Sequence, residues 1–156
     1  MSKVETIIGT YECKIDAKGR LMLPASLKKQ LGATDAASFV LKRSVFQPCL
    51  ELYTMDEWSK VHSKVSKLNQ FSKKNNNFIR LFNAGLKQIE LDGQGRILIS
   101  KDLMTYAQLD KDLVLSSAVN KIEIWDKAAY EDSLIMSDED FADLAEEVMR
   151  DTNDNE

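Results

Sequence analysis

The sequence of 156 residues has little cysteine and no long apolar run, and both absences exclude classes of protein. Its two cysteines, Cys13 and Cys49, are too few for a disulfide scaffold, and neither belongs to a Cys or His spacing typical of zinc sites. We expect buried, inert thiols in a reducing compartment. No stretch is long enough to span a bilayer and the first residues lack a signal-peptide pattern, which predicts a cytoplasmic protein without membrane contact.

The groups from which enzyme sites are built are also scarce. His62 is the only histidine, and no cysteine or carboxylate pair is spaced to complete a metal site or a catalytic triad with it. The segment Gly93-Gln94-Gly95 lacks the Gly-Lys-Ser/Thr ending of a phosphate loop. We interpret His62 as a surface residue and predict a protein that is not an enzyme and uses no cofactor and no metal ion.

The net charge of −4 shows no large excess of one sign, but the charges are unevenly distributed. Residues 131–156 contain eleven acidic residues and one arginine, whereas residues 1–130 contain 20 basic and 14 acidic residues. The body of the chain therefore carries +6 and the C-terminal segment −10. Because a basic body can neutralise phosphates, the acidic total does not exclude a nucleic-acid ligand.

A duplication is the main feature of the sequence. Residues 15–23, Ile-Asp-Ala-Lys-Gly-Arg-Leu-Met-Leu, align with residues 91–99, Leu-Asp-Gly-Gln-Gly-Arg-Ile-Leu-Ile, at an offset of 76. Leu-Glu-Leu-Tyr at 50–53 aligns with Ile-Glu-Ile-Trp at 122–125 at an offset of 72. In each copy, the alternation of apolar residues and the turn residues predict the order strand, tight turn, strand, short helix, strand, loop, strand, helix. The sequence therefore predicts an α+β fold built from two related copies.

An Asp-x-x-x-Arg motif occupies the tight turn of both copies. Alternation along the flanking strands places its aspartate and arginine together on the polar face of a hairpin. A glycine before each arginine permits the positive φ that such a turn needs. The motif residues are Asp16, Gly19 and Arg20 in the first copy and Asp92, Gly95 and Arg96 in the second.

Helix signals surround these strands. Pro24 suits a helix start before Gly32, and Thr54 opens a capping-box pattern. Residues 72–77 are polar and turn-rich, so we predict a linker there, followed by a short apolar helix over 78–84. Ser137 suits the start of a last helix, after which we expect residues 151–156 to be frayed.

The two turn motifs closely resemble the MraZ family of bacterial transcription regulators. The resemblance runs from about residue 8 to 130 and includes three further segments: Leu-Glu-Leu-Tyr at 50–53 followed by Glu57-Trp58, Arg80-Leu81-Phe82 with Ala84-Gly85, and Lys-Ile-Glu-Ile-Trp at 121–125. It implies two tandem SpoVT-AbrB-like swapped-hairpin β-barrel units with short flanking helices, related by a pseudo-twofold duplication. It also implies a ring-shaped homo-oligomer and repression of the division and cell-wall gene cluster.

The expected boundaries follow from this resemblance. The first unit spans residues 7–55, with a helix and linker to about residue 85, the second spans residues 86–129, and an acidic extension spans residues 137–156. The chain departs from the family pattern in two places. Ser100 stands where the first copy has Pro24, and the acidic extension looks longer than the family usually carries.

Arg20 and Arg96 are the residues that we expect to contact DNA, because a guanidinium binds phosphate or grips guanine O6 and N7 in a bidentate way. The alternative is a hairpin salt bridge, in which Asp16 or Asp92 holds the arginine four residues later or only closes its turn. The Asp-x-x-x-Arg pattern by itself is weak, and its repetition and the family resemblance favour DNA contact.

The two turn tips are not equivalent. Lys18 can reach a phosphate, whereas Gln94 in the same place can hydrogen-bond a base edge or a sugar, so the first turn is the better candidate for phosphate binding. Lys14, Lys42 and Arg43 are additional cationic candidates near strand ends, although a surface lysine is most often only a solvated charge.

The leading hypothesis is therefore a nucleoid-associated repressor that binds double-stranded promoter DNA with spaced direct repeats, including its own promoter. Several linked hairpins would supply the affinity that one small hairpin lacks. The alternative is an oligomeric adaptor or assembly protein without a DNA function, in which the acidic tail binds a basic partner.

Overall fold

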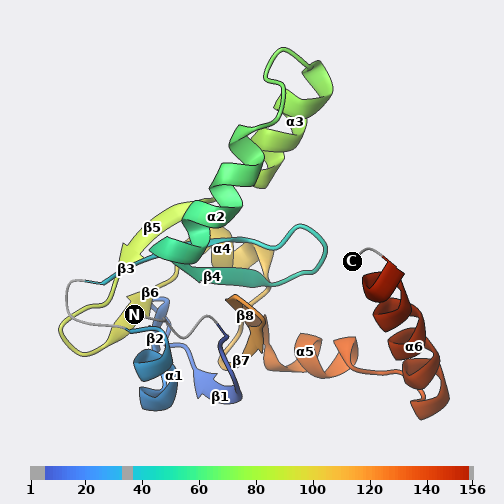
Figure 1. The fold of residues 1–156 in the computed structure, drawn as a ribbon. Helices are drawn as coiled ribbons and strands as arrows, with labels where there is room; N and C mark the ends of the chain where they lie inside the picture. Colours follow the sequence, from blue (N-terminus) through green and yellow to red (C-terminus); the bar gives the residue numbers. More distant parts are fainter. Residues whose placement is uncertain (1–5, 33–36, 155–156) are drawn as a thin grey trace.

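The computed structural model describes residues 6–32 and 37–154, and its elements repeat once along the chain (Figure 1). The predicted α+β class is confirmed. The first copy comprises β1 (Thr10–Lys14), β2 (Arg20–Met22), α1 (Ala25–Gln30), β3 (Ser38–Arg43), β4 (Leu50–Thr54) and α2 (Met55–Ser66). After α3 (Lys73–Phe82), the second comprises β5 (Lys87–Glu90), β6 (Arg96–Leu98), α4 (Lys101–Tyr106), β7 (Asp112–Ala118), β8 (Lys121–Asp126) and α5 (Lys127–Ser133). The last helix is α6 (Asp138–Asp154).

The two copies interlock in one antiparallel sheet with the strand order β1-β7-β8-β4-β3-β5. The first strand of each copy pairs with a strand of the other copy, β1 with β7 and β5 with β3. The strands that follow the turns, β2 and β6, pair with each other in a two-stranded ribbon. Within the described residues of the first copy, one bridge from Ile15 to Leu21 joins the strands on either side of the turn. This exchange corrects the simple hairpin expected from alternation and matches the swapped arrangement that the resemblance implies.

The strand register shows how the copies are related. In the ribbon, Leu21 pairs with Ile97, its own equivalent at the offset of 76. In the sheet, Glu51 lies opposite Glu123, its equivalent at the offset of 72. A residue that faces its own equivalent lies on the axis that exchanges the two copies. The local twofold axis therefore passes through both pairs, which confirms the predicted pseudo-twofold duplication.

The predicted alternation is present on the strands and directs apolar side chains from both copies into one core. Leu21 and Ile97 are at most 1% exposed, whereas Met22 and Leu98, one position further along, are 45% and 58% exposed. Truncating a buried leucine of this kind to alanine costs about 2–5 kcal/mol. Helices α1 and α4 add equivalent leucines to the core, Leu27 and Leu103.

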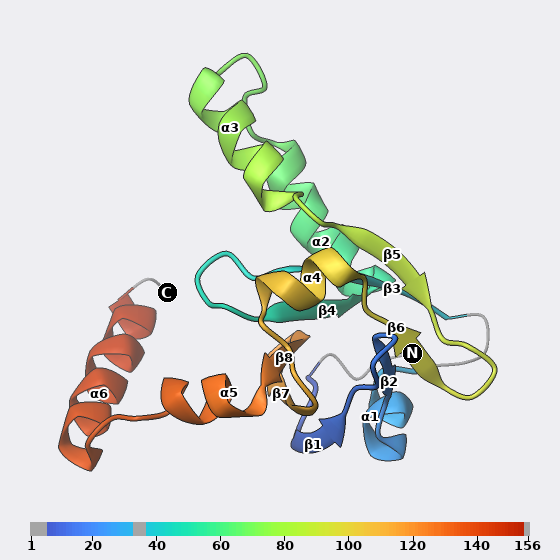
Figure 2. The same cartoon turned by 180° about the vertical axis from the view of Figure 1, so that it is seen from behind.

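The segment predicted as a linker is helical instead. Ser72 caps α3, because its Oγ accepts a hydrogen bond from the backbone N–H of Asn75 at 3.2 Å. At the other end of α3, the ring of Phe82 stacks on Trp58 of α2 with 6.2 Å between centroids. This packing outweighs the low helix propensity of the asparagines. Helices α2 and α3 form a hairpin that projects from the sheet (Figures 1 and 2).

The final helix also differs from expectation. Its predicted cap is confirmed, since Ser137 Oγ accepts from the backbone N–H of Asp140 at 3.1 Å. The helix continues to Asp154, which corrects the fraying predicted from residue 151, and residues 155 and 156 lie outside the described part. Helix α6 stands apart from the sheet, on a different side from the α2–α3 hairpin (Figure 2). Over residues 6–32 and 37–154, no helix combines the length and hydropathy needed to cross a membrane.

Candidate nucleic-acid interface

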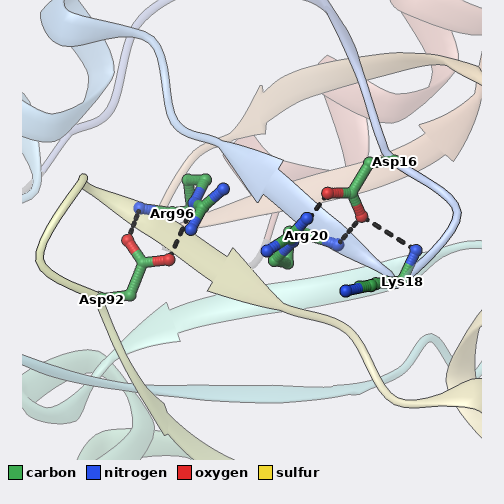
Figure 3. A network of polar contacts seen from close by, with 5 residues as sticks. All are labelled: Asp16, Lys18, Arg20, Asp92 and Arg96. Carbon is green, nitrogen blue, oxygen red and sulfur yellow. Dashed lines mark hydrogen bonds and ion pairs between the residues drawn. The ribbon is translucent and has the colours of Figure 1, made fainter.

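Each Asp-x-x-x-Arg turn is closed by its own aspartate (Figure 3). In the first turn, Asp16 Oδ1 accepts hydrogen bonds from the backbone N–H groups of Lys18 and Arg20, both at 2.9 Å. Asp16 Oδ2 accepts from Arg20 Nε at 2.7 Å. Gly19 has the predicted positive φ, 87°, and its N–H donates to the carbonyl of Asp16 at 3.0 Å. The aspartate therefore fixes both the turn and the arginine side chain.

The second turn repeats these bonds. Asp92 Oδ1 accepts from the N–H groups of Gln94 and Arg96 at 2.9 Å, and Oδ2 accepts from Arg96 Nε at 2.8 Å. Gly95 has a φ of 78° and donates to the carbonyl of Asp92 at 3.0 Å. Both predicted hairpin ion pairs are thus present.

These ion pairs leave a large part of each guanidinium available. Both are made through Nε, and within the described residues no hydrogen bond or ion pair engages the terminal nitrogens of Arg20 or Arg96. The side chains are 37% and 24% exposed. The aspartate therefore orients the guanidinium while its terminal N–H groups can still donate to an anion or a base edge. The salt bridge and the predicted DNA contact are compatible.

The carboxylates are held in their charged form. The pKa of Asp16 lies below its ordinary value because the backbone N–H of Arg20 donates to the carboxylate, with further lowering by the Arg20 side chain. The pKa of Asp92 is lowered in the same way, chiefly by the backbone N–H of Arg96. At neutral pH each turn thus contains an ionised carboxylate that fixes a charged arginine.

The ribbon brings the two arginines onto one surface. Arg20 pairs with Leu98, and Met22 pairs with Arg96. Because side chains alternate along a strand, these four residues project from the outer face while Leu21 and Ile97 point into the core. The arginines occupy diagonal positions on this face, at which residues of two paired strands lie roughly 7–8 Å apart. A two-stranded ribbon of this width fits the major groove of DNA.

Two members of this face were absent from the predicted site. Met22 and Leu98 share the parity of the arginines, a signal that the sequence does contain. The pairing of β2 with β6 is what makes all four residues one surface, and this long-range contact leaves no local pattern.

The other predicted cations lie in different surroundings. Lys18 and Gln94 are exposed at the turn tips, and Lys14 is exposed at the end of β1, on the sheet instead of the ribbon. Lys42 is fully buried, lies 3.7 Å from Glu51 Oε1 and covers the ring of Phe82.

Lys42 is therefore corrected from a surface candidate to a core residue, because a long stem can be buried when its charge is paired. Burial lowers its pKa. Arg43 is half-buried, with its guanidinium 4.8 Å from the centre of the Tyr106 ring.

The remaining candidates give no second site. His62 is exposed, as predicted. Burial raises the pKa of Cys13 to about 11 and that of Cys49 to about 12, so both thiols are protonated at neutral pH. Cys49 is buried, as predicted, whereas Cys13 is only partly covered.

Comparison with known proteins assigns both copies to one family. The family model described as MraZ protein matches the chain twice, over residues 6–81 and over residues 82–152. The chain belongs to the MraZ family. A relative from Flavobacterium psychrophilum is 61% identical over 98% of both chains, and one from Christiangramia forsetii is 59% identical over 92% of both. A relative from Pediococcus pentosaceus is 37% identical over 91% of this chain and 96% of its own. All three are named Transcriptional regulator MraZ.

The match changes how the two departures from the family pattern are interpreted. The family match continues to residue 152, so most of the acidic segment lies within the matched part of the chain. Ser100 and Pro24 occupy the same N-cap position of α4 and α1, so this difference changes only the capping residue.

Proposed function

We propose that this MraZ family protein is a sequence-specific DNA-binding repressor of the division and cell-wall gene cluster, including its own promoter. The names of the relatives support a role in transcription regulation. The observation that supports DNA contact is the β2–β6 ribbon, which presents two preoriented arginines on one exposed face. Such a protein acts in the cytoplasm, in association with the nucleoid.

In this proposal the ribbon enters the major groove with its outer face toward the bases. Arg20 and Arg96 donate to guanine O6 and N7 or to phosphates, while the aspartates maintain their orientation. Lys18 at the first turn tip binds a phosphate, and Gln94 at the second bonds a base edge or a sugar. Lys14 is available to the flanking backbone.

A single ribbon touches few base pairs, so we propose a ring-shaped homo-oligomer that presents several ribbons to direct repeats. Two surfaces support self-association. Residues 55–82, the α2–α3 hairpin, contain six basic and two acidic residues and expose Phe71 and Leu81 at 100% and 67%. Helix α6 contains eight acidic residues and one basic residue and exposes Phe141 and Leu144 at 63% and 43%.

These surfaces are complementary in charge, and each offers apolar area. They lie on different sides of one protomer (Figures 1 and 2). Packing of α6 on the α2–α3 hairpin of a second copy would therefore make a head-to-tail contact, which closes into a ring when the rotation between copies permits.

The function is tested with a mobility-shift assay on the DNA upstream of the gene for this protein. We expect binding at least about 10³-fold tighter to the native repeats than to a scrambled duplex of equal length and composition. Inserting about five base pairs between repeats turns them to opposite sides of the helix and should weaken binding strongly. Equal affinity for native and scrambled DNA would reject the proposal.

The ring is tested separately by ending the chain at Met136. Light scattering should show a lower mass than that of the full chain, and circular dichroism should retain the signal of the folded body. An unchanged mass would contradict the α6 contact. If the full chain forms the large assembly but binds neither native nor scrambled DNA, an adaptor or assembly protein becomes the better description.

A further inference from the structure

The two turns differ in the charge of their own tips. Lys18 gives the first turn a cation, and Gln94 leaves the second turn without one. Considered within its own copy, the second turn has only Arg96 for binding phosphate. Because the copies interlock, however, the residues around each turn come partly from the other copy.

Helix α1 of the first copy provides a lysine at the second turn. A Cβ atom placed on Gly95 would lie 2.6 Å from Lys28 Nζ and 3.6 Å from Lys28 Cε. The ammonium group is therefore in contact with the backbone of the second turn. At the first turn the corresponding neighbour is Met104 Sδ, 3.2 Å from a Cβ placed on Gly19. Lys28 and Met104 are equivalent residues at the offset of 76.

Among the residues that the structure describes, no carboxylate pairs with this ammonium. Lys28 is half-buried. Within the described residues, its ammonium group forms no ion pair and no hydrogen bond. The carboxylate of the second turn, Asp92, already accepts hydrogen bonds from the Arg96 side chain and from two backbone N–H groups. A lysine ammonium is a compact charge with three donors, well suited to a phosphate oxygen.

We propose that Lys28 is the phosphate-binding cation of the second turn. It comes from the first copy and takes the role that Lys18 has in the first turn, where the second turn has Gln94. The proposal rests on the DNA-binding function proposed above. It gives each end of the ribbon one arginine and one lysine, in spite of the different turn tips. It also gives Gly95 a second role, because any side chain there would displace the Lys28 ammonium.

The test measures how DNA affinity depends on salt for the full-length protein and the promoter duplex. Lys28→Met keeps the length of the stem and copies the equivalent Met104. We expect the slope of log affinity against log salt to become shallower by about 0.9 for each bound protomer, because one phosphate contact is lost. Lys29→Met, on the same helix and exposed, is the matched control and should keep the wild-type slope.

Two further variants separate a charge effect from a structural one. Lys28→Arg keeps the cation and should keep the slope. Lys28→Met combined with Gln94→Lys restores a cation at the same turn and should recover the slope, even if Lys28→Met lowers the melting temperature. A wild-type slope in Lys28→Met, or no recovery in the double variant, would overturn the proposal.

The failure of the proposal is distinguishable from failure of the proposed function. If Arg96→Ala weakens binding while Lys28→Met does not, the DNA-binding function stands and only the role of Lys28 is rejected. If neither Arg96→Ala nor Arg20→Ala changes the affinity, the ribbon is not the DNA-binding surface, and the roles proposed for the ribbon and for Lys28 are both rejected.

Discussion

The two turns of the ribbon have almost the same internal bonds but different surroundings. In both, an aspartate accepts two backbone N–H groups and an arginine Nε within 2.7–2.9 Å. The glycine of the first turn lies next to the Ile99 carbonyl and the Met104 side chain, whereas the glycine of the second turn lies next to the Lys28 ammonium group. The bonds are set by residues within five positions, so they persisted in both copies. The surroundings are set by the opposite copy and have diverged.

The largest expected effect comes from removing the arginine at each end of the ribbon. Arg20→Ala and Arg96→Ala should each cost on the order of 1–3 kcal/mol of DNA-binding free energy if the arginine reads a base. The double variant should lose sequence-specific binding, because neither end then donates a fork of N–H groups. Fluorescence anisotropy on native and scrambled duplexes measures both affinity and specificity.

The single arginine variants also sharpen the comparison. If the ribbon lies symmetrically in the groove, both cost the same. A variant that lowers affinity equally for native and scrambled DNA, with a shallower salt slope, identifies a phosphate contact at that end instead of a base contact. Circular dichroism should show an unchanged fold, since both side chains lie on the outer face.

The second largest effect is the loss of stability when the glycine of either turn is replaced by alanine. A Cβ on Gly19 would lie 2.4 Å from the backbone carbonyl oxygen of Ile99, which cannot move easily, whereas a Cβ on Gly95 meets the flexible end of Lys28. Positive φ costs an L-residue about 1–2 kcal/mol. We expect Gly95→Ala to lose about that much stability, and Gly19→Ala to lose more because the clash is added.

Urea unfolding of both glycine variants measures this difference. The DNA assay should show the reverse asymmetry at low salt, because Gly95→Ala displaces Lys28 while leaving the fold largely intact. Equal losses of stability would mean that the Ile99 carbonyl is free to shift, and that the first turn is less tightly packed than its geometry indicates.

The sequence predicted the local parts of the site and missed the parts that depend on contacts between copies. The turn glycines, the parity of Leu21 and Ile97, and the Thr54 cap, whose Oγ accepts from the Glu57 N–H at 3.2 Å, follow from residues within a few positions. The pairing of β2 with β6 joins residues 76 apart, for which no local pattern exists.

Burial explains the remaining errors. Lys42 looks like a surface cation at a strand end, but β3 lies between β4 and β5, and α3 places Phe82 over its ammonium. The asparagine-rich start of α3 looks like a linker until Phe82 is known to stack on Trp58. In both cases a tertiary contact decides the environment of the residue, and single-sequence patterns do not contain that contact.

The smallest expected effect concerns acid stability. In each turn the pKa of the aspartate is lower in the folded chain than its ordinary value of 3.8. Its ionised form therefore stabilises the fold above that pH, and the stabilisation is lost as the pH falls through the lowered folded value. Asp16→Asn and Asp92→Asn keep an oxygen for the backbone N–H groups but remove the acceptor for the arginine Nε.

We expect both aspartate variants to be less stable than wild type at pH 7, by a difference that begins to shrink near pH 4 and continues to shrink as the pH falls through the lowered pKa of the folded carboxylates. Asp92→Asn should lose slightly more, because Arg96 is 24% exposed compared with 37% for Arg20, so water screens its ion pair less. Urea unfolding at pH 7 and pH 3 measures this, with Asp143→Asn on α6 as the control. A difference that stays constant with pH would show that the aspartates close the turns as hydrogen-bond acceptors only, with no contribution from their charge.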